Sequence, residues 1–118
     1  MKKSKFKNEK EIRIVNGKLF YFDSKKEARR YDELYLLLKA KKIHDLILQP
    51  EFIICESLTY KNWKKSTARK YIADFSYFEK GNLKQIVEDV KGFRTDMYIL
   101  KRHLFLYKFG NEIDFREI

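Results

Sequence analysis

Apolar and polar residues alternate near the start of the chain in a pattern that predicts a β-hairpin. Glu11–Val15 and Lys18–Phe22 flank the dipeptide Asn16-Gly17. Asn-Gly between two such segments is the strongest short signal for a tight hairpin turn. Residues 11–22 are therefore expected to form an antiparallel pair of strands.

A helix is expected after this hairpin, with Asp23 or Ser24 as its cap. The segment Ser24-Lys25-Lys26-Glu27 fits a capping box, in which the serine and the glutamate satisfy free amide groups at the helix start. Lysines near residues 40–42 suit the negative end of a helix and mark its end. Four residues at helical spacing form the predicted buried stripe: Ala28, Tyr31, Tyr35 and Leu38.

Extended segments follow at Ile43–Leu48 and Phe52–Tyr60, separated by Gln49-Pro50, because proline suits a strand start or a sheet edge. Cys55 lies in an apolar run, and we expect it to be a small core residue. Lys61–Ala68 is polar and basic and is expected to form an exposed loop.

The segment from Tyr71 to Lys91 predicts a second hairpin, with a turn at residues 79–82. Pairing Leu83 with either Lys80 or Phe78 sets Asp74 opposite Asp89 or one diagonal step away. Side chains alternate between the faces of a strand, so either register places Asp74 on the face of Asp89 and Lys91.

A second helix is expected after this hairpin, capped by Thr95 or Asp96 and stopped by Gly110-Asn111. Its buried side is predicted to contain Met97, Leu100, Leu104 and Tyr107. Glu112–Ile118 alternates as a last strand should. The order of elements predicts an α/β fold, with a mixed central sheet flanked by helices and an N-terminal hairpin.

The chain has 118 residues, and we expect a basic arm at residues 1–10 followed by a single domain at residues 11–118. Its formal net charge of +10 favours a polyanionic partner, with nucleic acid ahead of an anionic membrane surface. The positive charge is concentrated in the arm and in Lys61–Lys70, which contains Lys61, Lys64, Lys65, Arg69 and Lys70 and no acid. The sequence shows neither a signal peptide nor a membrane span, and a cytoplasmic location is expected, which is the host cytoplasm if a phage encodes the protein.

Asp74, Asp89 and Lys91 form the candidate catalytic group. Two carboxylates on one sheet surface repel each other unless a cation lies between them. Hard oxygen ligands without histidine or cysteine favour Mg²⁺, with Mn²⁺ as the alternative. The alternative explanation is structural, with Asp74 or Asp89 paired to Lys91. Glu88 is expected to point to the opposite face.

These motifs resemble the PD-(D/E)xK nuclease superfamily, in which a helical glutamate, a strand aspartate and an acid-x-lysine motif lie in an αβββαβ arrangement. Within it, the chain is similar to small phage-borne proteins regarded as Holliday-junction-resolvase-like or as of unknown function. The motifs concerned are Phe22–Ala28, Leu48-Gln49-Pro50, Tyr71–Phe75 and Val87–Gly92. Ala73 replaces the usual proline, and Asp89 stands where glutamate is common.

The resemblance implies Asp74 and Asp89 as metal ligands with the Val90 carbonyl as a further one, and Lys91 as the residue that orients or helps deprotonate the attacking water. Glu27 would either cap its helix or reach the metal through water. Gln49 would lie near the cleft or bond to backbone.

Two further residues, Lys101 and Trp63, are candidates for contact with DNA. Lys101 would touch the scissile phosphate or remain solvated, and solvation is favoured. Trp63 would stack on a base or anchor its loop to the core, and the anchor is favoured.

We therefore expect a metal-dependent DNA endonuclease that recognises DNA structure, such as a four-way junction, and acts as a homodimer because paired cuts need two sites. The alternatives are a nucleic-acid-binding protein without catalysis and a transposase-type or nicking endonuclease of the same superfamily.

Overall fold

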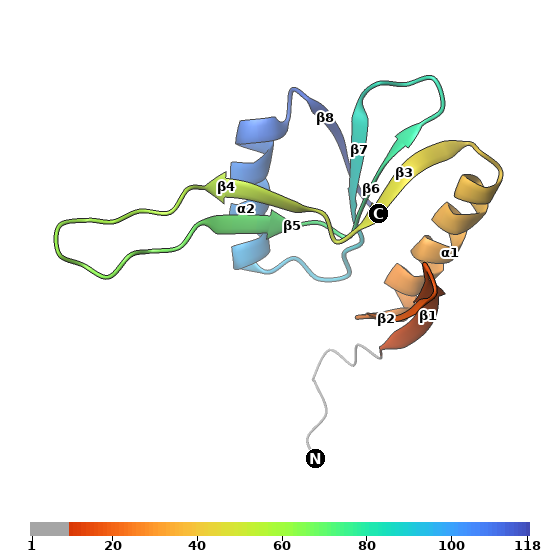
Figure 1. Ribbon diagram of the computed structural model, residues 1–118, viewed down its shortest axis with the longest axis horizontal. Coiled ribbons are helices and arrows are strands. Elements are labelled where there is room, and N and C mark those ends of the chain that lie inside the picture. Colours follow the sequence, from red (N-terminus) through yellow and green to blue (C-terminus); the bar gives the residue numbers. More distant parts are fainter. Residues whose placement is uncertain (1–9) are drawn as a thin grey trace, which may run out of the picture. The chain divides into compact units, whose positions relative to one another are not determined.

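The computed structural model describes residues 10–118 (Figure 1). These residues divide into two compact units, which separate between Lys42 and Ile43. Of the predicted basic arm, only Lys10 lies within the described residues. None of the described helices is both long enough and apolar enough to cross a membrane.

The N-terminal unit contains the predicted hairpin and the first helix. Strands β1 (Glu11–Val15) and β2 (Lys18–Phe22) pair antiparallel. Asn16 and Gly17 take φ values of 51° and 80°, the left-handed conformation that this turn requires. Helix α1 (Lys25–Lys39) begins where expected, with Ser24 rather than Asp23 as its cap.

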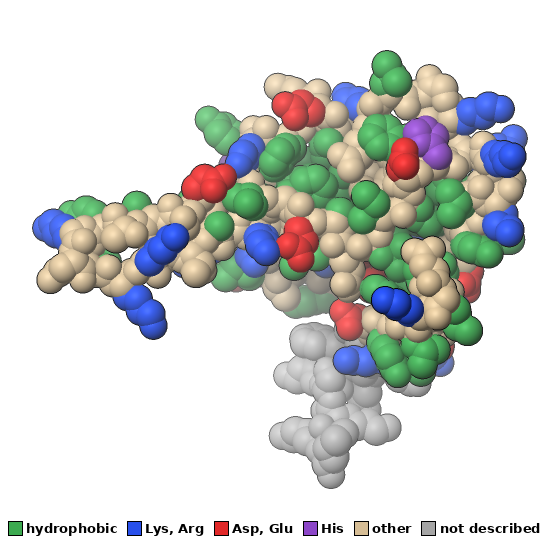
Figure 2. Space-filling model, in the orientation of Figure 1, with side chains coloured by type: hydrophobic (Ala, Val, Ile, Leu, Met, Phe, Trp, Pro, Cys, Tyr) green, Lys and Arg blue, Asp and Glu red, His purple; other side chains and the backbone are tan. Residues whose placement is uncertain are grey.

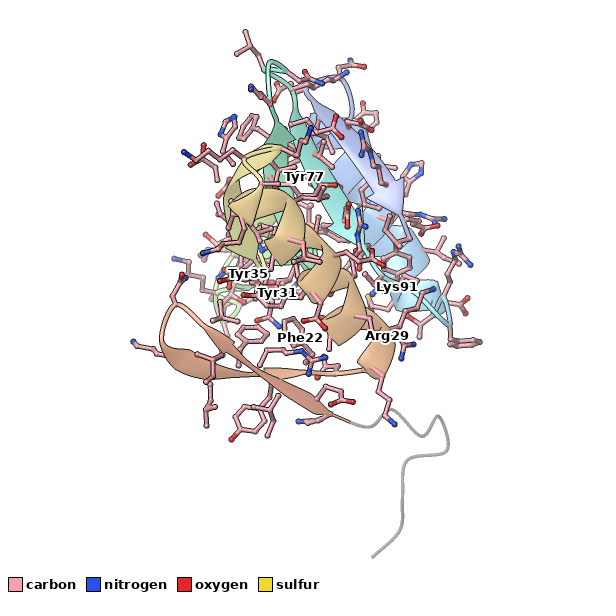
Figure 3. All side chains as sticks on the ribbon, turned by 90° about the vertical axis from the view of Figure 1, so that its right-hand side faces the viewer. Phe22, Arg29, Tyr31, Tyr35, Tyr77 and Lys91 are labelled. Atoms are coloured by element: carbon pink, nitrogen blue, oxygen red, sulfur yellow. The ribbon has the colours of Figure 1, made fainter. Side chains whose placement is uncertain are left out.

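Helix α1 packs on the hairpin through aromatic side chains and one ion pair. The Phe22 and Tyr31 rings lie 5.4 Å apart (Figure 3), and the Arg13 guanidinium donates two hydrogen bonds to Asp32. Leu34 is fully buried, whereas Tyr35, predicted to be buried, is 42% exposed. The inward stripe therefore follows Tyr31 and Leu34, three residues apart, rather than Tyr31 and Tyr35.

The second unit is built on a four-stranded mixed sheet. Its strand order is β3 (Ile43–Leu48), β6 (Phe75–Glu79), β7 (Gln85–Asp89) and β8 (Ile113–Glu117). The β7–β8 pair is parallel and the other two pairs are antiparallel. The remaining strands, β4 (Glu51–Cys55) and β5 (Arg69–Ile72), form a separate antiparallel pair.

These two sheets share one long ribbon that bends. The sequence pattern predicted one strand through Tyr71–Phe78, but the chain breaks at Ala73-Asp74, so that β5 pairs with β4 and β6 pairs with β3. The partner strand breaks at Gln49-Pro50, where Gln49 has a φ of 53°. Because both strands leave the sheet at the same place, β4 and β5 extend away from it as an arm (Figure 1). We call residues 51–72 the β4–β5 arm.

Strand β4 is shorter than predicted and less buried. It ends at Cys55 instead of reaching Tyr60, and the Cys55 side chain is exposed, so its prediction as a core residue is wrong. The reason is the alternation along β4, in which Phe52 and Ile54 face the core beside α2 while Ile53 and Cys55 face outward.

Helix α2 (Asp96–Phe109) packs through the side opposite to the predicted one. Thr95 caps it, and Phe105 is fully buried against Tyr71, Val87 and Ile113. The predicted stripe is exposed instead, with Met97 at 59%, Leu100 at 53%, Leu104 at 37% and Tyr107 at 87%. Both stripes have helical spacing, and the aromatic rings of β4, β5 and β8 favour the one that contains Phe105 and Phe109. The α/β fold class, the mixed sheet and the N-terminal hairpin are confirmed.

Candidate active site

The candidate site lies where the bent ribbon meets the end of β7. Two backbone hydrogen bonds hold the bend: the Gln49 amide donates to the Asp74 carbonyl at 2.9 Å, and the Ala73 amide donates to the Pro50 carbonyl at 3.1 Å. A left-handed φ is costly for a glutamine, and such strain is concentrated at functional sites and tight bends. Gln49 thus touches the site through its backbone, while its side chain is exposed.

The register of β6 with β7 brings the two predicted aspartates to the same end of these strands. Phe75 pairs with Glu88, and the Asp74 amide donates to the Glu88 carbonyl at 3.1 Å. Continued by one residue beyond that pair, the register would set Asp74 across from Asp89. This is the first of the two predicted registers, the one in which Lys80 would pair with Leu83.

Asp74 is half-buried and held by the strand across from it. Its Oδ2 accepts a hydrogen bond of 2.7 Å from the backbone amide of Val90. A charged acceptor strengthens such a bond, so the Asp74 carboxylate is fixed in direction toward the end of β7.

Asp89 is only 1% exposed and has a partner at each carboxylate oxygen. The Tyr71 hydroxyl donates to Oδ2, and the Lys91 Nζ lies 3.1 Å from Oδ1. Burial of a carboxylate is costly unless it is hydrogen-bonded and paired. Tyr71 satisfies Oδ2, whereas Oδ1 makes no hydrogen bond with any described residue and is compensated by the charge of Lys91 alone.

Lys91 is held on its other side by an aromatic ring. Its Nζ lies 4.5 Å from the centre of the Tyr98 ring in α2, close enough for a cation–π interaction. The side chain is 27% exposed. The ammonium is therefore positioned between a buried carboxylate and a ring, with an open path to solvent.

The sequence analysis did not single out Tyr71, whose ring lies in the core cluster of the second unit. Burial raises the pKa of its hydroxyl, and the nearby charge of Asp89 raises this pKa further. The hydroxyl therefore stays protonated and remains a donor to Asp89. Its sequence signal was weak, since an aromatic residue in a strand is ordinary core material.

A second group that the sequence analysis missed surrounds Tyr98. The Tyr98 hydroxyl donates to Glu117 at 2.6 Å, and Arg94 and Arg102 both pair with the same carboxylate, at 2.9 and 2.5 Å. The hydrogen bond from Arg94, followed by those from Tyr98 and Arg102, lowers the pKa of Glu117 to about 2. The spacing of four residues between Arg94, Tyr98 and Arg102 was the one signal for this cluster in the sequence.

Residues 3–117 match the family described as "Protein of unknown function (DUF1064)". The chain belongs to the DUF1064 family. No curated protein and no solved structure matches it.

In this DUF1064 chain, the oxygen donors at the end of β7 fit a small hard cation. Asp74 and Asp89 directly adjoin the last paired residues, Phe75 and Glu88, and the Val90 amide donates to the Asp74 carboxylate. Among residues 10–118, no group of three or more His, Cys, Asp and Glu side chains gathers as a metal site. A cation would therefore need a backbone carbonyl, water or phosphate oxygens besides the two carboxylates, as Mg²⁺ commonly does.

Two further acids of this DUF1064 chain, Glu88 and Glu27, were considered in the sequence analysis. Glu88 points to the opposite face of the sheet, as predicted, and accepts a hydrogen bond from Tyr77. Glu27 belongs to the N-terminal unit, where its amide donates to Ser24 Oγ at 3.1 Å and its side chain is 6% exposed. The capping arrangement is thus confirmed on the serine side, while a role for Glu27 at a metal stays a prediction.

The predicted DNA-binding residues other than Gln49 and Lys101 lie together on the β4–β5 arm. Lys and Arg side chains are spread along the arm (Figure 2), and those concerned are Lys61, Lys64, Lys65, Arg69 and Lys70, all exposed. Lys70 is paired with Glu51 at 3.0 Å. Trp63 is 67% exposed, so the prediction that it anchors the loop to the core is wrong. Lys101 is half-buried on α2.

Proposed function

We propose that this protein is a metal-dependent DNA endonuclease that hydrolyses phosphodiester bonds. The observation that supports the proposal best is that the Lys91 ammonium lies 3.1 Å from Asp89 while Asp74 Oδ2 accepts a hydrogen bond from the neighbouring Val90 amide, just beyond the Phe75–Glu88 pair of the β6–β7 register. Two carboxylates and an amine at one strand end match the resemblance to the PD-(D/E)xK superfamily.

Asp74 and Asp89 would hold Mg²⁺ or Mn²⁺, with the Val90 carbonyl as a further ligand. The ion would supply Lewis-acid stabilisation of the charge that develops on the phosphate. Lys91 would orient the attacking water or, as the neutral amine, help remove its proton; as the ammonium it would offset negative charge in the transition state. The water oxygen forms a bond to phosphorus as the bond to the 3′ oxygen breaks, and the leaving 3′ oxygen takes a proton from solvent, which leaves a 5′-phosphate and a 3′-hydroxyl.

The exposed cations of the β4–β5 arm support DNA as the substrate. Phosphate contacts by such side chains do not read sequence, and their contribution to affinity falls steeply as salt rises. Recognition of DNA structure, such as a four-way junction, therefore fits better than base readout. Paired cuts across a junction would need two active sites, hence a homodimer.

The test is cleavage of supercoiled plasmid, a synthetic four-way junction, a flap and a linear duplex, with and without Mg²⁺ or Mn²⁺. We expect metal-dependent cleavage, strongest on the branched DNA, that Asp74→Asn and Asp89→Asn abolish without loss of folding. Glu112→Ala is the matched control, because it removes an exposed acid elsewhere in the same unit. Binding of these substrates without cleavage at any metal concentration would overturn the proposal.

Calorimetric titration with Mg²⁺ separates the two roles assigned to the charged residues. Lys91→Ala should bind the metal at least as well as the wild type, because Asp89 Oδ1 loses a competing cation, yet cleave far more slowly. Asp89→Asn should lose metal binding itself. Equal metal binding by both variants would contradict the assignment.

A second candidate is a nucleic-acid-binding protein without catalysis. It is favoured by one observation: both oxygens of Asp89 already have protein partners, Tyr71 and Lys91, as a structural carboxylate would. The same cleavage assay decides between the two.

A further inference from the structure

The tip of the β4–β5 arm exposes aromatic side chains that the core does not use. Trp63 is 67% exposed, Tyr60 is 50% exposed and Leu58 is 61% exposed. The Tyr60 and Trp63 rings meet edge to face, with centres 5.4 Å apart and planes at 81°. Grouped exposed aromatics on a protruding element usually mark a binding site.

Backbone hydrogen bonds stabilise the turn at this tip. The Trp63 amide donates to the Tyr60 carbonyl at 2.9 Å, which closes the turn. Two further hydrogen bonds join Leu58 and Ser66, at 2.8 and 2.7 Å. Lys61 takes a φ of 52°, a costly conformation for a lysine that glycine would adopt freely. The turn thus presents Trp63 outward while placing a lysine beside it.

The charged residues near the Tyr60 and Trp63 rings in the sequence are all basic. No Asp or Glu occurs between Glu56 and Asp74, whereas five Lys or Arg residues do. The Lys61 Nζ lies 5.2 Å from the centre of the Tyr60 ring, so it covers Tyr60 and leaves Trp63 as the open aromatic surface. Positive charge with an open aromatic ring fits a polyanion that also offers flat, unpaired rings.

We infer that the arm tip binds DNA at unpaired bases, with Trp63 stacked on a base and Lys61, Lys64 and Lys65 on the flanking phosphates. Aromatic stacking is tolerant of base identity, because every base has a π-face. Bases inside an intact duplex are already stacked, so the tip prefers single strands, flaps and the centre of a branched junction. The inference rests on the proposed function only in taking DNA as the partner.

Trp63 is the only tryptophan of the chain, so its fluorescence reports on this site alone. The experiment uses the full chain carrying Asp74→Asn in the presence of EDTA, so that no cleavage intervenes. Titration with a short oligothymidylate should quench the fluorescence strongly. Titration with a blunt-ended duplex of the same length should quench it little.

Affinity is measured in parallel by the anisotropy of labelled DNA at several salt concentrations. Trp63→Ala should weaken binding to the single strand by roughly 5- to 150-fold and leave the salt dependence unchanged. Trp63→Phe should recover most of the loss, since it keeps a ring. Lys64→Ala combined with Lys65→Ala should lower the salt dependence instead.

Tyr107→Ala is the matched control, because Tyr107 is an even more exposed aromatic residue, at 87%, on α2 of the same unit. It should change neither measurement. Unchanged single-strand affinity in Trp63→Ala, or an equal loss for single strand and duplex, would overturn the inference.

A basic tip with aromatic residues also resembles a membrane-surface contact, so vesicles of phosphatidylserine and phosphatidylcholine form a further arm of the test. A blue shift of the Trp63 fluorescence with vesicles, together with no quenching by single-stranded DNA, would overturn the inference. If quenching by single strands occurs while the wild type cleaves no DNA with metal, the arm-tip inference stands and the endonuclease proposal fails.

Discussion

The hydroxyl of Tyr71 donates a hydrogen bond to Asp89, so a side chain from β5 fixes a carboxylate at the end of β7. The bend at Ala73-Asp74 makes this contact possible, because it turns β5 out of the sheet while keeping the Tyr71 ring against Phe105, 4.5 Å away. The same residue therefore belongs to the core and to the candidate site.

Tyr71→Phe should lower both stability and cleavage. It keeps the stacked ring but leaves Oδ2 of Asp89 without its donor, which should cost about 1–3 kcal/mol in the free energy of unfolding, measured with urea. Tyr77→Phe is the control, because it removes the same kind of bond from Glu88 on the opposite face. Only Tyr71→Phe should change the Mg²⁺ concentration for half-maximal cleavage. The same change in both variants would show that Tyr71 has no specific role in metal binding.

Glu117 should make the protein sensitive to acid. Its pKa is about 2 when folded, against an ordinary value of 4.5, mainly because Arg94 donates to it. The stabilisation is present above about pH 4.5 and is lost as the pH falls toward 2, by up to about 3 kcal/mol. Urea unfolding across this range should show the loss in the wild type and in the exposed-acid control Glu112→Gln, but much less in Glu117→Gln. A wild-type profile matched by Glu117→Gln would refute the assignment.

Neighbouring residues of α2 should respond very differently to truncation. Phe105 is fully buried among Tyr71, Val87 and Ile113, so Phe105→Ala should cost about 3–5 kcal/mol in the free energy of unfolding. Leu104 is 37% exposed, and Leu104→Ala should cost about 1 kcal/mol or less. Thermal and urea unfolding of the two variants measure this difference, and a larger loss for Leu104→Ala would mean that α2 packs through its other side.

The start of α1 offers a test of its cap. Ser24→Ala removes the acceptor for the Glu27 amide and should cost about 1 kcal/mol in the free energy of unfolding, measured by circular dichroism in urea. Ser57→Ala, at an exposed loop position, is the control and should cost nothing measurable. If Glu27→Gln loses cleavage while its stability is unchanged, Glu27 acts at the active site as well as at the helix cap. If it loses stability while cleavage is unchanged, Glu27 acts only at the cap.

Several elements followed from the sequence because their signals are local. Asn16-Gly17 gave the hairpin and its register, since that turn needs two left-handed residues in a row. Ser24 and Thr95 marked the helix starts because each side chain accepts from an amide three residues on. The helix end at Gly110 was also predicted, from the usual preference for a left-handed glycine there. In the structure Gly110 has a φ of −58°, and glycine is required instead because an added Cβ would lie 2.4 Å from the Leu106 carbonyl oxygen.

The sequence by itself determined the α/β class, the N-terminal hairpin and the starts of the two helices, because alternation along strands, turn chemistry and helix capping act over a few residues. Only the tertiary structure decided which side of α2 is buried, where the β4–β5 ribbon leaves the sheet, and that Tyr71 and the Tyr98 cluster surround the charged pair. Those outcomes depend on packing between segments far apart in the chain. No local pattern distinguishes two helical stripes of similar hydrophobicity until the rings that cover one of them are in place.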